Sequence, residues 1–478
     1  MLLVELRLTS PQDEHELLQH LSLDAPDSRD HELKTAPIFT RDAYVATKAQ
    51  QVFSQRGLLG SVMEIYDKNG ANHADTCHDN RLYLNTNAPF SALVCGVQGS
   101  GKSHTVSIVL EDMLIPKCSR IGALNKALSG LVLHFGEGGP YSLPCEAAWV
   151  GVSQNSSLKL PPVHIYASNS SLNTMKTVYA PLGSRVTVQP LLFSESELDA
   201  QAFLSMMAIG ASDHVPLYMQ TVLSILRQLG ESYSYTAFKK ELEARKAKFM
   251  PPQLSGLEQR MALLEAFLEK PKSSKKQRAA PPRFAAGQLT IIDLSDPFID
   301  PASASGLFEI IVRLFVRAKV DTGKVLVVDE AHKYLSPDKT SSGLTKELLS
   351  LIRQQRHQAM RVVISTQEPT VVPTVLLDLC SVAILHRFSS PAWWDHVAKH
   401  VSADIDNKEA FDKVVNLKTG QALLLAPSGL AVSRLATQKA HGTEVVPTLR
   451  QFGRKSVLIR TRQRVTRDGG ASILVVGT

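Results

Sequence analysis

The pattern of apolar and polar positions predicts alternating strands and helices over much of the chain. Continuous apolar runs, typical of buried strands, occur at 289–294, 324–329, 361–366 and 382–388. Between them, apolar residues recur at helical spacing over 306–319 and 342–357. An earlier segment, 82–117, reads as a strand, a glycine turn and a helix. This alternation predicts an α/β fold with a mainly parallel sheet covered on both faces.

The remaining segments divide the chain into further regions. Residues 1–80 are polar, with helical periodicity over 40–66 and no run of alternating strands. The core is expected at 81–117 and 286–440, interrupted by an insertion over 118–285. The insertion contains one possible strand at 163–168.

From residue 194 onward the insertion is predicted to be largely helical. Its helical part begins with the capping-box pair Ser194 and Glu197. It ends in a basic, proline-punctuated stretch at 270–284, for which a flexible loop is expected and a nucleic-acid contact is the alternative. Near the end of the core, the run 421–436 predicts a hairpin that turns at Ser428–Gly429. Residues 441–478 form a basic C-terminal extension.

Composition narrows the class of protein. The 478 residues are 44% hydrophobic and 20% charged, which excludes a disordered chain, and 52 basic against 45 acidic residues leave a net charge of +7. A mild basic excess is compatible with a nucleic-acid partner. The five cysteines lie far apart without a CxxC pair, which disfavours a disulfide scaffold or a zinc finger.

The same inspection predicts where the protein resides. The first residues carry Glu5 and Arg7 within a short apolar run, which is unlike a secretory signal. No run approaches the roughly 18 apolar residues that a spanning helix needs. We therefore expect a soluble intracellular protein of the cytoplasm or the nucleus or nucleoid, without a membrane partner.

The segment GVQGSGKS fits the phosphate-loop pattern G-x-x-x-x-G-K-[ST], between an apolar strand and a helix. Glycines let backbone N–H groups approach phosphate oxygens closely, and the helix that follows directs its positive end at the anion. Lys102 would bridge the β- and γ-phosphates, and the Ser103 hydroxyl would ligate Mg²⁺. The residues predicted to bind nucleotide are Gly96, Gly99, Ser100, Gly101, Lys102, Ser103 and His104.

An acidic pair, Asp329 and Glu330, directly follows the apolar run VLVV. Phosphoryl transfer needs one carboxylate to hold Mg²⁺ and one to orient the attacking water, so we predict Asp329 for the metal and Glu330 for the water. The alternative is a pair of acids that cap the next helix. His332, two positions further on, is more typical of ordinary packing or solvent exposure than of signalling.

A polar strand end follows at Ser365, Thr366 and Gln367. In a parallel sheet, residues just past the strand ends line the ligand crevice, so Gln367 is predicted to contact the γ-phosphate or the attacking water. Simple turn chemistry before Pro369 is the alternative.

With the phosphate loop, VVDEAH and ISTQEP in this order, the chain resembles the HerA-like branch of the HerA/FtsK superfamily of RecA-like ATPases. The resemblance covers 82–117 and about 289–426, including LIRQQRHQAMRVVISTQEP and LKTGQALLLAP. It implies a RecA-like P-loop NTPase core, ATP and Mg²⁺ as cofactors, a homo-oligomer in the form of a hexameric ring and translocation on double-stranded DNA, with a nuclease or another protein as a candidate partner. The family's N-terminal β-barrel is not recognisable in residues 1–80.

The resemblance also implies an arginine supplied by a neighbouring subunit. Arg356 is the best match, with Arg353 and Arg387 behind it, because a guanidinium neutralises charge on the transferring phosphoryl group. Surface solvation is the alternative for each. In the C-terminal extension, alternate spacing on a strand would put Arg460, Arg462 and Arg464 on one face suited to DNA phosphates, although an edge strand or a subunit interface explains the spacing as well.

Two other functions stay open. The string Asp329–His332 invites a DEAH-type helicase, but Lys102 and Asp329 lie 227 positions apart (329 − 102), and too little chain follows Gln367 for a second RecA-like domain. A nucleotide-dependent switch or scaffold ATPase, which hydrolyses ATP without translocating anything, is the more serious alternative. Stimulation of the ATPase by duplex DNA distinguishes a motor from a switch.

Overall fold

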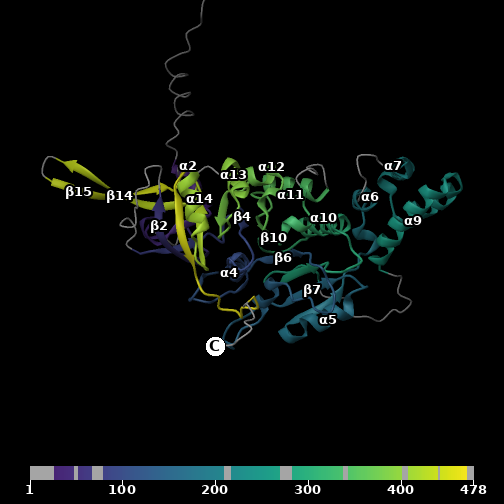
Figure 1. Cartoon of the computed structure of the whole chain (residues 1–478), viewed down its shortest axis with the longest axis horizontal. Coiled ribbons are helices and arrows are strands. Elements are labelled where there is room, and N and C mark those ends of the chain that lie inside the picture. Colours follow the sequence, from purple (N-terminus) through teal and green to yellow (C-terminus); the bar gives the residue numbers. More distant parts are fainter. Residues whose placement is uncertain are drawn as a thin grey trace, which may run out of the picture.

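One continuous β-sheet organises the molecule (Figure 1). The structure, a computed structural model, describes residues 26–47, 52–66, 79–208, 217–269, 282–336, 343–400, 407–439 and 442–470. The hydrogen-bonded order of the strands is β15-β14-β1-β3-β2-β16-β13-β12-β4-β11-β10-β6-β9-β7-β8, with β5 (Gly122–Ala123) beside β2. The sheet therefore has a part built by the chain ends and a part built by its middle.

The middle part is parallel, as the apolar runs predict. Neighbouring strands from β12 to β8 all pair in parallel. In spatial order these strands are β12 (Val382–Leu385), β4 (Ser91–Cys95), β11 (Met360–Thr366), β10 (Lys324–Val328), β6 (Ser129–His134), β9 (Leu289–Asp293), β7 (Val163–Ala167) and β8 (Val186–Pro190). The expected α/β fold with a mainly parallel sheet is confirmed.

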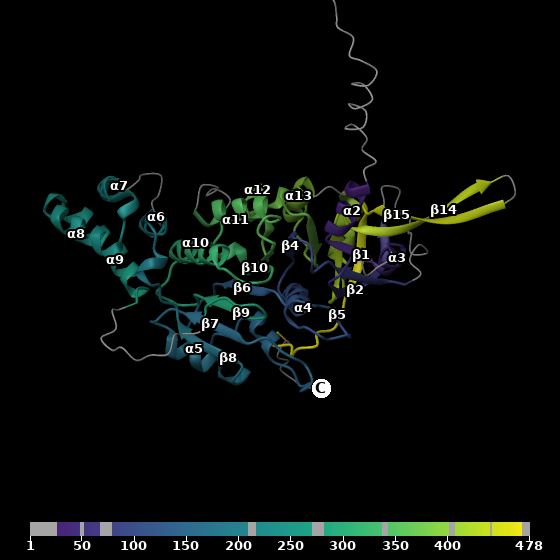
Figure 2. The same ribbon diagram turned by 180° about the vertical axis from the view of Figure 1, so that it is seen from behind.

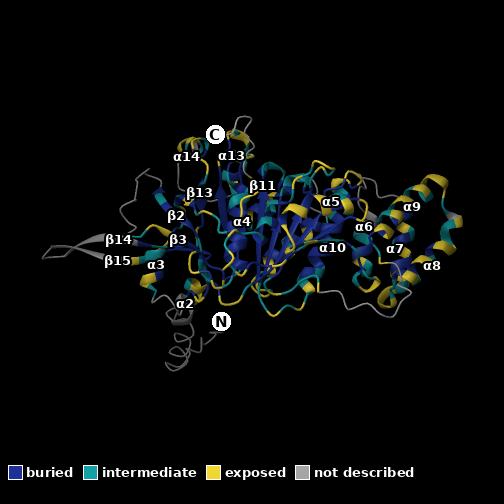
Figure 3. Ribbon diagram, turned by 90° about the horizontal axis from the view of Figure 1, so that it is seen from below, coloured by how far each residue is buried: buried dark blue, intermediate teal, exposed yellow. Residues whose placement is uncertain are grey.

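Helices cover this parallel part on both faces (Figures 1 and 2). Successive strand residues point to opposite faces, so Val325 and Val327 join the cluster under α4 while Leu326 and Val328 join the one under α10. Figure 3 shows the buried strands of the sheet between the helices, and α4 and α10 are themselves largely buried. The first face carries α4 (Lys102–Leu114) and α5 (Leu172–Tyr179), and the second carries α10 (Pro301–Arg317), α11 (Gly343–Gln354), α12 (Thr374–Asp378) and α13 (Pro391–His400).

The chain ends build the other, largely antiparallel part. Its strands are β13 (Gln421–Leu425), β16 (Ser456–Thr461), β2 (Arg56–Tyr66), β3 (Arg81–Leu84), β1 (Ile38–Thr40), β14 (Leu430–Lys439) and β15 (Gly442–Gln451). β14 and β15 extend from the body as a two-stranded arm (Figure 1). A β-domain made partly from the N-terminal region thus exists, although no run of strands was predicted there.

The predicted helical region at 40–66 is wrong over most of its described residues. Only α3 (Arg41–Ala46) is helical, and β2 occupies 56–66. The pairing of β2 shifts register against both neighbours, with Leu59 as the extra residue opposite β3. The bulge places Leu59, Val62 and Ile65 on the buried side at a spacing of three, which imitates a helix.

The predicted hairpin around Ser428–Gly429 is also wrong. A tight turn does occur there, where the Gly429 amide donates to the Ala426 carbonyl at 2.8 Å. The strands on either side diverge, however, because β13 pairs with β12 and β16, whereas β14 pairs with β15 and β1. The hairpin partner of β14 is β15.

Four strands of the sheet, β5 to β8, come from within 118–285, the stretch assigned to an insertion, and β5 pairs with β2. β6 lies between β10 and β9, and β7 and β8 extend the sheet beyond β9. β7 confirms the strand suggested at 163–168. Only the part from residue 194 is additional to the sheet.

That additional part is helical, as predicted. It comprises α6 (Ala200–Ala208), α7 (Leu217–Leu229), α8 (Tyr235–Arg245) and α9 (Pro251–Ala266) at one end of the molecule, opposite the β14–β15 arm (Figure 2). Ser194 and Glu197 form the expected capping box, on a short 3-10 turn before α6. Most of the basic stretch, 270–281, lies outside the described residues. Within the described ranges, none of the helices has the combination of length and apolar character that crossing a bilayer requires.

Candidate functional site

The predicted motifs meet at the carboxyl edge of three neighbouring strands. The glycine-rich loop links β4 to α4, Asp329 and Glu330 follow β10, and Gln367 follows β11. β11 lies between β4 and β10, so Gln367 stands between the loop and the acidic pair. Parallel pairing puts all three strand ends at one edge.

The loop has the backbone that its glycines permit. Gly99 and Gly101 have φ of 73° and 104°, in the left-handed region that disfavours side chains. A Cβ on Gly96 would lie 2.6 Å from Ser100 Oγ and 2.7 Å from His386 Cβ. Ser100 is itself buried and donates its hydroxyl to the Val97 carbonyl at 2.7 Å. The loop is thus tightly wound and can present backbone rather than side chains.

The helix after the loop starts at the predicted lysine. α4 begins at Lys102, so the amides of Lys102, Ser103 and His104 precede the first helical hydrogen bond, which Thr105 makes to Gly101. Such first-turn amides are free to bind an anion. The loop and helix start therefore fit a phosphate group on geometric grounds.

Lys102, Glu330 and Gln367 form one contact cluster. Lys102 Nζ lies 3.0 Å from Glu330 Oε1, although the residues are 228 positions apart in sequence. Gln367 Nε2 donates to both Glu330 oxygens at 2.9 and 3.0 Å. Lys102 is 4% exposed, so its charge is held by the carboxylate rather than by solvent.

The backbone of Glu330 is strained. Its φ of 49° and ψ of 46° are left-handed, a conformation that costs a non-glycine residue about 1–3 kcal/mol. The surrounding structure holds this turn in place, since the Lys333 amide donates to the Glu330 carbonyl at 2.9 Å. The turn directs the carboxylate toward the loop instead of along the strand.

Asp329 is paired with a histidine from the neighbouring strand. His134 at the end of β6 donates from Nδ1 to Asp329 Oδ2 at 3.0 Å. Burial by itself would raise the pKa of Asp329, but the hydrogen bond and charge of His134 lower it below its ordinary value. Asp329 is therefore kept ionised, as a ligand of a cation must be.

His332 contacts both catalytic candidates. Its Nδ1 lies 3.3 Å from Glu330 Oε2 and 3.5 Å from the backbone amide of Gln367, which donates to it. Burial lowers the pKa of His332 below its ordinary value. The residue thus links the ends of β10 and β11, more than the sequence led us to expect.

His386 directly follows β12 and lies next to Gly96 of the glycine-rich loop. Its Nδ1 faces the Gln421 carbonyl at 3.1 Å, which requires Nδ1 to carry the proton, and its Nε2 then accepts from the Thr105 hydroxyl at 2.9 Å. The ring is fully buried, and this burial lowers its pKa to about 4. The neutral ring of His386 therefore links α4 to the sheet through these two hydrogen bonds.

The other predicted loop residues differ in what they offer. Ser103 is partly exposed at the second position of α4. The ring of His104 is directed elsewhere, with Nε2 donating to the Arg462 carbonyl at 2.9 Å. Only the backbone amide of His104 remains available for a nucleotide.

The three candidate arginines lie at two opposite edges of the parallel part of the sheet. Arg353 and Arg356 are exposed at the end of α11 and in the turn before β11, which is the edge opposite Gln367. Arg387 is exposed directly after β12, and its carbonyl accepts from the Val97 amide of the phosphate loop at 3.0 Å. Arg356 is therefore remote from the site of its own chain, whereas Arg387 is beside it.

The prediction that alternate C-terminal arginines share a DNA-facing strand is wrong. β16 ends at Thr461, and Arg462 pairs with Glu111 at 2.6 Å and with Asp112 at 2.9 Å. Arg464 pairs with Glu146 at 2.6 Å. These two ion-paired side chains hold the segment after β16 against α4 and against the turn that contains Glu146. Of the three arginines, only Arg460 is exposed.

Sequence reasoning missed His134 and His386. Both follow apolar runs, SGLVLH and VAILH, and so end buried strands. A polar residue at the carboxyl end of such a run is a signal that was used for Asp329 and Gln367 but not for these two. The strand ending at His134 was itself not recognised.

No protein-family model matches the chain, and no curated protein matches its sequence. Its structure is similar to that of VirB4 of Thermoanaerobacter pseudethanolicus, at 11% identity over 85% of this chain and 97% of that one, with a TM-score of 0.44. The bacterial conjugative coupling protein TrwBΔN70 has 11% identity over 85% and 91%, with a TM-score of 0.40. B204, the DNA-packaging ATPase of Sulfolobus turreted icosahedral virus, has 11% identity over 70% and 92%, with a TM-score of 0.31.

Proposed function

We propose that this protein is a Mg²⁺-dependent P-loop ATPase of the HerA/FtsK type that couples hydrolysis to translocation on double-stranded DNA. The observation that carries the proposal is the contact of Lys102 with Glu330, and of Glu330 with Gln367, beside a glycine loop that leads into α4. Such a cluster has a lysine for phosphate, a carboxylate for water and an amide for a sensor within one site.

Each part of the site has a separate proposed role. The loop from Gly96 to Gly101 and the first amides of α4 would bind the phosphates, with Lys102 on their terminal oxygens. Ser103 and Asp329 would hold Mg²⁺, which neutralises charge on the transferring group when bound. A phosphate on the loop competes with Glu330 for the Lys102 ammonium, and this competition frees the carboxylate to orient water.

The assignment is tested first by nucleotide binding. Lys102→Ala should lose tight ATP binding, measured by fluorescent-nucleotide titration, because a buried cation that faces the phosphates is removed. The control is Lys126→Ala, which removes an exposed lysine paired with Asp321. Equal nucleotide affinity in both variants would contradict the phosphate-loop assignment.

Hydrolysis provides the second test. Glu330→Gln should bind ATP but turn it over about 10²–10⁴-fold more slowly, since an amide of the same shape cannot act as a base. Glu409→Gln, an exposed change on α14 (Asn407–Val415), is the matched control. Normal turnover by Glu330→Gln would move the catalytic role to another residue.

One observation favours the second candidate, a switch or scaffold ATPase. The burial of Arg462 and Arg464 in ion pairs removes two of the cations that had suggested a DNA surface. The two functions differ in a single measurement: a motor's ATPase rate rises several-fold with duplex DNA, and the rate of a switch does not. Solution mass with and without ATP and duplex DNA tests the proposed hexameric ring in the same samples.

A further inference from the structure

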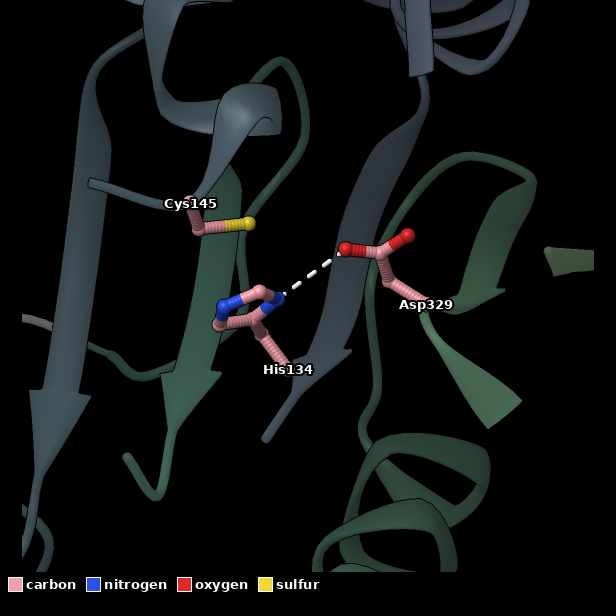
Figure 4. A group of neighbouring side chains, drawn as sticks. All are labelled: His134, Cys145 and Asp329. Atoms are coloured by element: carbon pink, nitrogen blue, oxygen red, sulfur yellow. Dashed lines mark hydrogen bonds and ion pairs between the residues drawn. The ribbon is translucent and has the colours of Figure 1, made fainter. Parts of the chain in front are cut away.

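A mixed cluster of ligand-type side chains lies beside the proposed catalytic site (Figure 4). His134 ends β6, Cys145 precedes the 3-10 turn η2 (Glu146–Gly151), and Asp329 follows β10. One ligand atom from each lies within 4.8 Å of the others. Cys145 Sγ and the Asp329 carboxylate both lie beside the His134 ring (Figure 4).

Hydrogen bonds from the surrounding structure fix two of the three ligand positions. The Cys145 amide donates to Tyr179 Oη at 3.0 Å, and Tyr179 in turn donates to Asp293 at 2.6 Å. Tyr334 Oη donates to the Asp329 carbonyl at 2.9 Å. His134 belongs to a strand paired on both sides. The three side chains are therefore held together by the fold, as the ligands of a preformed site are.

The donor set selects the kind of cation. Thiolate, imidazole and carboxylate together are ligands for Zn²⁺ and similar transition metals, whereas Mg²⁺ prefers oxygens. Tetrahedral Zn²⁺ with the usual bond lengths sets its ligand atoms about 3.4–3.6 Å apart. The His134–Asp329 pair, at 3.0 Å, needs to open by about 0.4–0.6 Å, and the remaining contacts need to close by about 1.2–1.4 Å at most from their 4.8 Å limit.

The cluster is also reachable. Cys145 is buried, but the side chains of His134 and Asp329 are 16% and 12% exposed. An ion can therefore reach these two side chains from solvent, and a fourth position is left for water or another small ligand. A structural zinc centre, by contrast, supplies four protein ligands.

We propose that His134 Nδ1, Cys145 Sγ and Asp329 Oδ2 form a binding site for Zn²⁺ or a similar thiophilic divalent cation, separate from the Mg²⁺ position at Ser103. Binding replaces the His134–Asp329 hydrogen bond, releases the Nδ1 proton of the imidazolium while Nε2 keeps its own, and releases the thiol proton of Cys145. Because Asp329 is shared, an ion here withdraws this carboxylate from Mg²⁺ and inhibits the ATPase. This inhibitory consequence, unlike the binding itself, rests on the proposed function.

The direct test uses Co²⁺ as a spectroscopic substitute for Zn²⁺ on the full chain. We expect one equivalent to give visible d–d bands and a thiolate-to-cobalt charge-transfer band, which Zn²⁺ then abolishes. Cys145→Ser should remove the charge-transfer band and His134→Gln should weaken Co²⁺ binding about 10–100-fold or more. Cys118→Ser is the matched control, because Cys118 is also buried but lies in a different hydrophobic cluster.

Every outcome decides the proposal. A wild-type protein without a thiolate band overturns it, and so does a band that survives Cys145→Ser in a chain with an unchanged circular dichroism spectrum. If Cys145→Ser fails to fold, His134→Gln takes its place, and unchanged Co²⁺ affinity in that variant overturns the site. In each of these cases, we would conclude that His134, Cys145 and Asp329 form a hydrogen-bonded cluster that does not bind the cation.

An ATPase measurement distinguishes a failure of the metal site from a failure of the proposed function. Zn²⁺ should inhibit wild-type ATPase at saturating Mg–ATP, and Cys145→Ser should keep its basal rate while its inhibition constant rises at least about tenfold. A cobalt band without any ATPase activity leaves the metal site standing and contradicts the ATPase assignment. ATPase activity without a cobalt band does the reverse.

Discussion

The burial of His386 predicts that acid destabilises the protein through this one side chain. In the folded chain the ring is neutral and its pKa is lowered from 6.5 to about 4, chiefly because burial disfavours its charged form. The unfolded chain binds a proton near pH 6.5, so unfolding takes up a proton between these two values. Stability from His386 is fully present above about pH 6.5 and is lost progressively down to about pH 4.

The magnitude follows from the two pKa values. A difference of 2.5 units between 6.5 and about 4 corresponds to about 3 kcal/mol at the acid limit. Between pH 7 and pH 5, linkage gives a loss of about 2 kcal/mol, which is a large share of a typical unfolding free energy of about 5–15 kcal/mol.

The assay compares urea unfolding of the wild type and His386→Gln from pH 7 to pH 5. Glutamine has no titratable group in this range, and its amide can donate to Gln421 and accept from Thr105, the partners of the ring. We expect the wild type to lose about 2 kcal/mol more than the variant over this interval. His31→Gln, at an exposed position of α2 (Pro26–Thr35), controls for the loss of one histidine.

A result that would refute the reasoning is a parallel loss of stability in wild type and His386→Gln. The same loss would show that His386 binds its proton at the same pH in the folded and the unfolded chain. An unfolding slope that changed with pH would instead indicate a second transition, and the comparison would then be made at a fixed fraction unfolded.

Three further predictions follow from other contacts. Arg462→Ala leaves buried Asp112 without its cation and Glu111 with Arg464 at 3.8 Å, and should destabilise the chain by about 3–5 kcal/mol in chemical unfolding, whereas exposed Arg460→Ala should have little effect; equal losses would contradict a stabilising role of the Arg462 ion pairs. Gly96→Ala should weaken ATP binding at least about tenfold because its Cβ meets Ser100 Oγ at 2.6 Å; unchanged affinity in a nucleotide titration would show that the loop relaxes. Arg356→Ala should lose hydrolysis and regain it in mixed rings with a subunit that has a defective phosphate loop but an intact arginine; mixed rings without activity would exclude this arginine.

Local pattern predicted most strands of the parallel part of the sheet, although it missed β6 between β10 and β9. Strands at 324–328 and 360–366 lie where continuous apolar runs predicted them, because a strand buried on both faces is apolar at most successive positions and this pattern is visible in the sequence. The bulged strand β2 was misread because register shifts depend on its neighbours β3 and β16. The hairpin failed for the same reason: partner choice is a property of the whole sheet, not of a turn.

The amino-acid sequence by itself located the glycine-rich loop, the acidic pair and the polar strand end, since each is a contiguous motif whose local backbone geometry depends on neighbouring residues. Only the tertiary structure decided which side chains meet across long separations: Lys102 with Glu330, His134 with Cys145 and Asp329, and Arg462 with α4 instead of DNA. Distances of a few ångströms between residues hundreds of positions apart depend on strand order and register. Those quantities are fixed by packing of the complete sheet, and no local window of sequence contains them.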